Sequence, residues 1–385
     1  MKAILTICRM ELGRVLTLKP AFSVLIVATL IYAAFYPQPY RTEALRHVPI
    51  AVVDLDGTDS SRQLARRVDA SADVSVAAVF PDQATAEREV YARNLYGVLV
   101  IPQYFERELL HNRQSPVALY ADASYFLIYQ RISGGVAAVA RTMGAEVETA
   151  RLIAARVDPR IAAAASDPMP LIPVPLFNPQ GGYATYILPA AFVLIMQQTL
   201  LIGVGLLGTY RNDALKTGPA ASIGPIAVVA GKLLAYLILE VLIVPFYLIV
   251  VPYLYNIPRL GTPLSIFIFA LPFVLAVSAL GLIIAGLFRS PLTVQLVSAA
   301  LGIPFLFLAG FSWPTEAIPP FLHAIAMLLP STSAINGIVA VSQLGAPLSY
   351  VRPAFLTLWI LAAVYILIAI ALETGRQRRR PAAGA

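Results

Sequence analysis

The amino-acid sequence predicts a polytopic α-helical membrane protein with six transmembrane helices and an extracytoplasmic α/β domain inserted between helices 1 and 2. Composition is the first observation behind this fold class, because 58% of the 385 residues are hydrophobic and only 13% are charged. Soluble domains carry roughly 25% charged residues. Charge segregation is the second, because 16 of the 21 acidic residues lie within residues 38–180. We therefore expect one soluble-type segment within an otherwise apolar chain.

The N-terminal part of the chain predicts an anchor in the membrane. Residues 1–20 are basic and amphipathic, and they are either a basic flank or a helix lying along the cytoplasmic surface. Residues 21–37 hold the first apolar run, which we expect to be the first transmembrane helix. It resembles a signal peptide in length, but Ala33 and Ala34 are followed by bulky residues that disfavour cleavage. An uncleaved signal anchor is therefore expected.

Residues 38–180 have the texture of a soluble domain. They contain 14 arginines, no lysine and 16 acidic residues. Strand-like runs alternate with helical patterns, which indicates a small α/β domain. The predicted strands are 48–54, 74–80, 96–102 and 117–120, and the predicted helices are 58–69, 83–94, 103–112 and 124–165. A proline-rich stretch after Asp167 is expected to link this domain back to the membrane.

Residues 181–373 form the rest of the predicted membrane domain. Each span needs about 20 apolar residues, and the expected helices 2 to 6 are 183–208, 226–252, 263–288, 292–312 and 352–373. Residues 209–230 are expected to form a cytoplasmic loop. Residues 313–351 contain five prolines and are expected to form an outer re-entrant-like segment. Residues 374–385 form a basic tail.

Basic residues predict the orientation of the chain. With the N-terminus inside, the short outer loops receive only Arg259 and Arg352, and most of the other basic residues outside 38–180 fall on the cytoplasmic side. Both termini are therefore expected in the cytoplasm, and residues 38–180 outside. The positive charge flanks apolar runs instead of forming one polar face, so no nucleic-acid partner is expected. The single cysteine, Cys8, excludes an intrachain disulfide and a cysteine-based metal site.

Polar residues within the apolar runs are candidates for a substrate path. Glu240 lies midway along a predicted span, where a carboxyl group is costly and usually faces a cavity or a partner. Gln197, Gln198 and Gln295 are weaker candidates of the same kind. The structural alternative is that these side chains hold helices or subunits together.

The stretch Asp54-Leu-Asp56-Gly57-Thr58 resembles the opening motif of haloacid-dehalogenase-type phosphatases, in which the first Asp is the nucleophile. That chemistry also needs a cation, normally Lys, and residues 38–180 contain none. We therefore favour a turn followed by a helix cap. Gly231-Lys232 lacks the earlier glycine of a phosphate-binding loop, so no ATP-binding loop of that type is present. No catalytic residue or metal site is assigned.

Several stretches, in this order, carry a resemblance to a known family. They are Met10-Glu11-Leu12, Val48 to Asp54, Tyr96 to Phe105, Gly231 to Tyr236, and Leu308-Ala-Gly310-Phe-Ser-Trp-Pro314-Thr-Glu316-Ala-Ile-Pro319 followed by Leu329-Pro330-Ser-Thr. Together with the layout, they resemble the permease subunits of type-2 ABC exporters, particularly drug-efflux-like members with a large domain after the first span. The resemblance covers nearly the whole chain.

This resemblance implies a multi-pass permease subunit in the bacterial cytoplasmic (inner) membrane, not an enzyme. It implies two cytoplasmic ABC ATPase subunits that hold ATP and Mg, and a second permease subunit, identical or different. A periplasmic adaptor and membrane lipid are the other expected partners. The substrate is expected to be hydrophobic or amphipathic, drug-like or lipid-like, and to be exported.

The resemblance also assigns two groups of residues. ATPase coupling falls on Arg211, Asn212, Asp213 and Lys216, a degraded form of the family's acidic element. The outer gate turn contains Gly310, Pro314, Glu316 and Pro319. The degraded element leaves an alternative open, namely a non-transporting envelope scaffold or sensor whose outer domain binds a partner protein.

Overall fold

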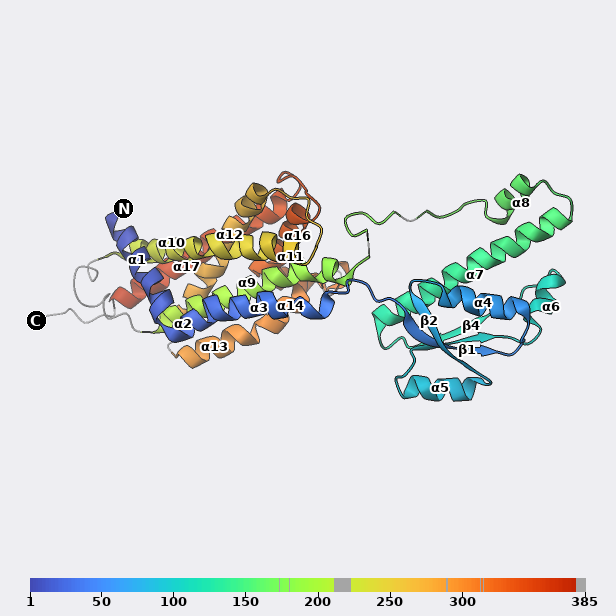
Figure 1. The fold of residues 1–385 in the computed structure, drawn as a ribbon. Helices are drawn as coiled ribbons and strands as arrows, with labels where there is room; N and C mark the ends of the chain where they lie inside the picture. Colours follow the sequence, from blue (N-terminus) through green and yellow to red (C-terminus); the bar gives the residue numbers. More distant parts are fainter. Residues whose placement is uncertain are drawn as a thin grey trace, which may run out of the picture. The chain divides into compact units, whose positions relative to one another are not determined.

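The chain forms two compact units (Figure 1). The computed structural model describes residues 1–172, 174–179, 181–210, 223–288, 290–311, 313 and 315–378. One unit contains Met1–Glu43 and Pro175–Ala385, and the other contains Ala44–Val174. These boundaries lie a few residues inside the predicted limits of 38 and 180.

A four-stranded sheet forms the centre of the Ala44–Val174 unit. Its strands are β1 (Val48–Asp54), β2 (Val74–Phe80), β3 (Gly97–Ile101) and β4 (Ala118–Ala121), in the order β2-β1-β3-β4. Both β2 and β3 run parallel to β1, and β4 pairs antiparallel with β3. All four strands lie within one residue of the predicted ranges, because their β-branched runs are bounded by turn residues.

Helices cover both faces of this sheet. They are α4 (Asp59–Asp69), α5 (Gln83–Tyr91), α6 (Phe105–Leu110), α7 (Phe126–Ala154) and α8 (Pro159–Ser166). Side chains alternate along β1, so Ile50 and Val52 pack with α4 and α7, whereas Ala51 and Val53 pack with α5.

The prediction of a single helix over 124–165 is wrong. The chain leaves the helix after Ala154 and begins a new one at Pro159. Asp158 accepts a hydrogen bond from the N–H of Arg160, and proline is well placed at a first helical position because its missing N–H is not needed there. A helix start signal therefore interrupts the apolar periodicity.

The other unit is helical in every regular element that the structure describes. In chain order these are α1 (Lys2–Thr17), α2 (Lys19–Phe22), η1 (Ser23–Ala28), α3 (Thr29–Phe35), η2 (Gln38–Tyr40), α9 (Tyr183–Thr209), α10 (Pro225–Pro245), η4 (Phe246–Val250), α11 (Val251–Leu254), α12 (Pro263–Leu287), α13 (Pro291–Ala300), α14 (Gly302–Leu308), η5 (Thr315–Ala317), α15 (Pro320–Ala326), α16 (Pro330–Ser342) and α17 (Arg352–Arg378).

Five of the described helical segments are long and apolar enough to cross a membrane. They are Lys19–Tyr40, Tyr183–Thr209, Pro225–Leu254, Pro263–Leu287 and Arg352–Arg378. A sixth results only if α15 and α16, which are bent by 81° at their junction, count as one broken span. The chain is therefore a polytopic, predominantly helical membrane protein.

The predicted continuous span 292–312 is wrong. Helix α13 ends at Ala300, and a second short helix, α14, begins at Gly302. Pro304 lies in the first turn of α14, and a proline there has no N–H to donate to the carbonyl of Ala300, so α13 and α14 cannot form one unbroken helix. The apolar composition therefore continues past Ala300, whereas helix α13 ends there.

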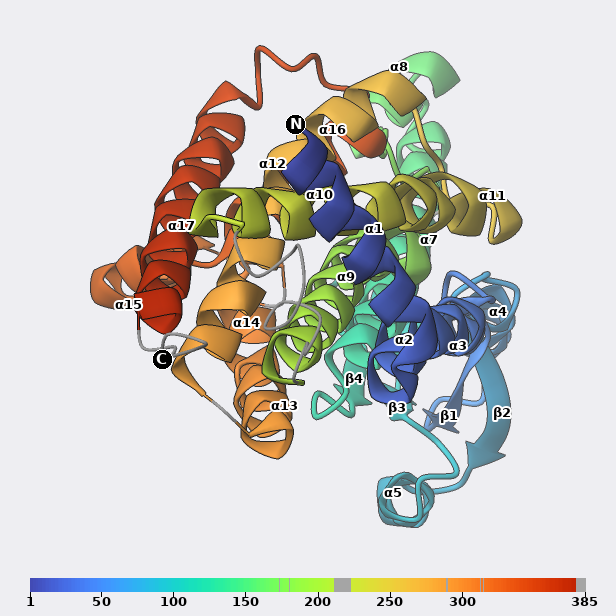
Figure 2. The same cartoon turned by 90° about the vertical axis from the view of Figure 1, so that its left-hand side faces the viewer.

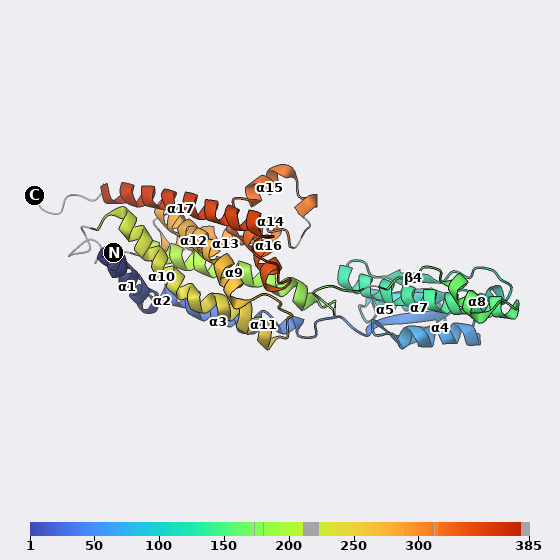
Figure 3. The ribbon, with the colours of Figure 1, turned by 90° about the horizontal axis from the view of Figure 1, so that it is seen from above.

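Helix α12 lies at the centre of the membrane unit. It packs against α9, α10, α16 and α17 (Figures 2 and 3). Small residues bring α9 close to it, since a Cβ on Gly281 would lie 2.9 Å from Val204 and one on Gly208 would lie 2.4 Å from Ala285. Such close approach is a common way for helices to pack within a membrane.

Hydrogen bonds of Glu43 join the two chain segments that connect the units. Its backbone carbonyl accepts a hydrogen bond from the N–H of Tyr183 at 2.7 Å. Its carboxylate accepts from the N–H and the hydroxyl of Thr185 at 3.3 and 3.0 Å. A carboxylate is stabilised there because the first N–H groups of α9 have no helical partner.

Candidate functional site

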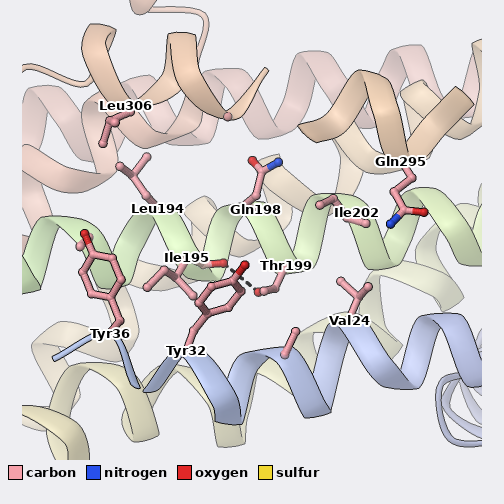
Figure 4. Close-up of a pocket in the computed structure, with 13 residues that line it drawn as sticks. Val24, Tyr32, Tyr36, Leu194, Ile195, Gln198, Thr199, Ile202, Gln295 and Leu306 are labelled. Carbon is pink, nitrogen blue, oxygen red and sulfur yellow. Dashed lines mark hydrogen bonds between the residues drawn. The ribbon is translucent and has the colours of Figure 1, made fainter. Parts of the chain in front are cut away.

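A cavity of about 470 Å³ opens among three segments of the membrane unit. Its walls come from η1–α3, from α9 and from α13–α14 (Figure 4). The residues that line it are Val24, Ala28, Tyr32, Tyr36, Ala191, Leu194, Ile195, Gln198, Thr199, Ile202, Gln295, Gly302 and Leu306. Most of these side chains are apolar or aromatic, so the cavity suits a ligand with a large apolar surface.

Two glutamines supply polar groups to this cavity. Figure 4 shows Gln198 pointing from α9 toward α13–α14, and Gln295 pointing back toward α9. The amide of Gln198 donates to the backbone carbonyl of Ser298, which holds the side chain in place. The hydroxyl of Thr199 donates to the backbone carbonyl of Ile195 at 2.8 Å, within the same helix. A few fixed polar groups on an apolar wall can orient a ligand.

The structure divides the four predicted path residues between two places. Gln198 and Gln295 line the cavity together. Gln197 and Glu240 do not line it, and both are buried elsewhere in the membrane unit. Whether any of the four contacts a substrate stays a prediction.

The predicted coupling residues Arg211, Asn212, Asp213 and Lys216 lie outside the described residues. The segment just before them is held by the N-terminal helix. The guanidinium of Arg14 donates to the carbonyls of Leu207 and Tyr210 at 2.7 and 3.0 Å. Two carbonyls at the C-terminal end of α9 are therefore satisfied by α1.

A buried carboxylate connects this contact to α10. Glu11, only 1% exposed, accepts from the guanidinium of Arg14 at 2.8 Å and from the hydroxyl of Tyr236 at 2.6 Å. Glu11, Arg14 and Tyr236 thus join α1, α9 and α10, and we call them the coupling triad. Sequence analysis missed this triad, although Glu11 and Tyr236 each lie in a stretch that carried the family resemblance.

The predicted outer gate turn is described only in part. Gly310 has φ +83°, a conformation that suits glycine, and Pro319 precedes the first residue of α15. Glu316 lies exposed in η5. Pro314 lies outside the described residues. The hydroxyl of Tyr186 at the start of α9 donates to the carbonyl of Phe311, which joins this turn to α9.

The Asp54 motif in the other unit is a closed hydrogen-bonded turn. Asp54 accepts from the N–H groups of Asp56 and Gly57 and from the hydroxyl of Ser61. The hydroxyl of Thr58 accepts from the N–H of Ser61 and caps α4. This geometry favours the structural interpretation, because both oxygens of the would-be nucleophile serve the turn.

The neighbouring carboxylate is also held by the fold. Burial raises the pKa of Asp56, but hydrogen bonds from the hydroxyl of Thr58 and the N–H of Glu106 outweigh it and leave the pKa below its usual value. In the part of the chain that the structure describes, no group of three His, Cys, Asp or Glu side chains is placed to hold a metal ion.

Apolar spanning helices, a cavity between them and a network that holds the end of α9 define a multi-pass membrane transport subunit. Comparison with known protein families makes the assignment specific. The family of ABC-2 transporter proteins matches residues 21–371, and the chain belongs to this family. The family is one of transporter permeases, not of enzymes, and it implies an ATPase partner and dimerisation in general.

One relative shares nearly the whole length of the chain. The linearmycin resistance permease protein LnrN of Bacillus subtilis (strain 168) is 21% identical over 360 residues, which cover 90% of this chain and 92% of the relative. A match of this extent includes residues of both units.

Proposed function

We propose that this chain is the permease subunit of an ATP-driven exporter that moves a hydrophobic or amphipathic substrate out across the bacterial cytoplasmic membrane. The cavity of about 470 Å³ carries this proposal. Its volume lies within the range of roughly 300–1,000 Å³ that holds small-molecule ligands. Its apolar wall with two glutamines matches a drug-like or lipid-like molecule.

In this proposal, both termini lie in the cytoplasm and the Ala44–Val174 unit lies outside. Cytoplasmic ABC ATPase subunits hold ATP and Mg and act on the segment that contains Arg211 to Lys216. A second permease subunit, identical or different, completes the translocation path. The outer turn with Gly310, Pro314, Glu316 and Pro319 gates release, and the outer unit contacts a periplasmic adaptor.

The coupling triad supports a route from the ATPase to the cavity. The guanidinium of Arg14 holds the last turn of α9, and the same helix carries Gln198 into the cavity. A displacement of the segment after Tyr210 therefore reaches the cavity through one continuous helix, which is a rigid element. The name of the relative, a linearmycin resistance permease, favours export of a compound to which the exporter gives resistance.

Two measurements test this function. Affinity purification of the tagged chain from its native membrane should yield a stoichiometric ABC ATPase. In vesicles that contain the complex, Leu194→Trp should fill the cavity and reduce export at least tenfold. Leu242→Trp, on the exposed face of α10, should leave export within twofold of wild type.

Each outcome has a plain meaning. A preparation without any ATPase, made under conditions that preserve known complexes, would favour the envelope scaffold or sensor. Equal export by both tryptophan variants at equal abundance would show that the cavity is not the substrate path. Gln198→Leu and Gln295→Leu then refine the result, since loss of either polar group should change which substrates are exported more than the rate for the most apolar ones.

A further inference from the structure

Among the described residues of the membrane unit, six buried polar side chains have unpartnered atoms and lie outside the cavity, namely Gln197, Glu240, Ser278, Ser298, Ser331 and Thr332. Three of them, Gln197, Glu240 and Ser278, lie on the helices α9, α10 and α12. Among the described residues, neither amide atom of Gln197 has a hydrogen-bond partner, and the same holds for Oε2 of Glu240 and the hydroxyl of Ser278. All three side chains are buried, with 1%, 4% and 1% of their surface exposed. An unsatisfied polar group is costly in a water-free environment, so these unpartnered atoms require an explanation.

Gln197 and Ser278 lie in the same interface between α9 and α12. The contacts of Gly208 with Ala285 and of Val204 with Gly281 show that the two helices run in the same direction. They place Ser278 level with Leu201, one turn from Gln197, or about 6 Å along the axis. Residues spaced by three or four share a helix face, so Gln197 faces α12 like Val204, and Ser278 faces α9 like Gly281.

Glu240 reaches the same level from α10. Tyr247, in η4 directly after α10, packs edge-on against Phe192 of α9 with ring centroids 5.5 Å apart. Because α10 runs opposite to α9, the seven residues from Tyr247 back to Glu240 correspond to about seven residues along α9 from Phe192. Glu240 is therefore level with the stretch between Gln197 and Leu201. It also shares a helix face of α10 with Tyr236, which is fully buried in the core.

The remaining buried hydroxyl and charged groups on the helical segment that carries Glu240 have partners elsewhere or lie in another pocket. None of the ion pairs found among the described residues includes Glu240. Tyr236 donates to Glu11, and Tyr247 donates to the carbonyl of Thr29. Lys232 lies two turns away, about 12 Å along the helix, where it lines a separate small pocket with Glu373 and Arg376.

We propose that Gln197, Glu240 and Ser278 form a binding site for a monovalent alkali cation in the middle of the membrane unit. Carboxylate, amide carbonyl and hydroxyl oxygens are the ligands that hard cations prefer. One carboxylate balances one positive charge, whereas a divalent ion would leave a net charge in a medium of low dielectric constant, where charge is costly. The site is separate from the cavity that holds Gln198 and Gln295.

Thermal stability of the purified full-length protein in lipid nanodiscs tests this site. Its melting temperature is measured by intrinsic fluorescence in lithium, sodium or potassium chloride and in N-methylglucamine chloride at the same ionic strength. We expect at least one alkali cation to raise the melting temperature in a saturable way, because a ligand that binds only the folded state stabilises it. Glu240→Gln should abolish the rise. Ser278→Ala should raise the half-saturating concentration by about tenfold, as expected for the loss of one ligand.

Glu373→Gln is the matched control, since this carboxylate lies on α17, outside the proposed cation site, and accepts from Gln377 on its own helix. It should keep the full response. Equal melting temperatures in all four salts would overturn the proposal even if no variant folds. A rise that persists in Glu240→Gln would overturn it as well, because the cation would then bind elsewhere. The readout is stability and not transport, so this result is independent of the proposed export.

Discussion

Replacing Tyr236 with phenylalanine removes the hydroxyl that donates to the carboxylate of Glu11 over 2.6 Å. The ring, which is fully buried, keeps its packing. Glu11 is only 1% exposed, so water has little access to the freed oxygen. The change therefore isolates one hydrogen bond of the coupling triad, the one that joins α1 to α10.

The expected loss follows from the charge of the acceptor. Hydrogen bonds to charged groups contribute about 1.5–3 kcal/mol, and neutral ones about 0.5–1.5 kcal/mol. Tyr236→Phe should therefore lower the free energy of unfolding by about 2 kcal/mol. Tyr247→Phe, which removes a bond to the neutral carbonyl of Thr29, should cost about 1 kcal/mol. Glu11→Ala should cost about 3 kcal/mol, because it also leaves the guanidinium of Arg14 without its carboxylate.

Reversible unfolding of the full-length protein in mixed micelles of dodecyl maltoside and sodium dodecyl sulfate, followed by tryptophan fluorescence, measures these losses. A double-mutant cycle between Glu11→Ala and Tyr236→Phe then gives their coupling energy, expected at about 1–2 kcal/mol. Tyr253→Phe, on a residue that is 80% exposed, controls for the loss of a tyrosine hydroxyl. A loss below about 0.5 kcal/mol for Tyr236→Phe, or one no larger than that of Tyr253→Phe, would refute the reasoning.

Three further predictions rest on single contacts. Gly337→Ala should destabilise the protein by about 1–3 kcal/mol, because the new Cβ would lie 1.9 Å from the ring of Phe269. Gly375→Ala, with open space around the new Cβ, should instead stabilise the protein by about 0.5–1 kcal/mol. Melting temperatures that shift in the same direction for both variants would contradict this prediction. Burial raises the pKa of the Cys8 thiol, so a maleimide should label the native protein slowly at neutral pH and rapidly after denaturation; equal labelling rates would show that the thiol is accessible. Hydrogen bonds from the N–H and then the hydroxyl of Thr85 hold the pKa of Asp82 below its ordinary 3.8. A group with a lowered folded pKa stabilises above the unfolded value and loses that contribution as pH falls through the folded value. The protection of the α5 amides against hydrogen exchange, relative to the intrinsic exchange rate at each pH, should therefore fall below about pH 4, and Asp82→Asn should remove that dependence.

Local sequence signals were sufficient for much of the architecture. The strands β1 to β4 follow β-branched runs, and the long apolar runs follow the spanning helices. The errors fell where an apolar pattern continued through a break in the backbone. Pro304 and Pro159 each marked such a break, but composition averaged over a window concealed both.

The candidate site was less accessible to sequence analysis. Gln197 and Gln198 are adjacent in sequence, yet successive residues of a helix point about 100° apart. Gln198 therefore lines the cavity while Gln197 faces α12, and hydropathy cannot tell which helix each one meets. The coupling triad joins residues more than 200 positions apart, so only the packing of α1 on α10 reveals it.

Glu43 gives the inserted unit an unusual degree of independence. Its hydrogen bonds to Tyr183 and Thr185 hold together the two chain segments that lead into and out of the inserted unit. The stability of the membrane unit should therefore depend little on the length of chain between these segments. The entropy of closing a loop grows only with the logarithm of its length, so reducing the roughly 140 residues between Glu43 and Tyr183 to about ten changes the closure free energy by only about 2 kcal/mol. Evolution could therefore enlarge, exchange or delete this domain as a cassette, with its attachment point as the sole fixed feature.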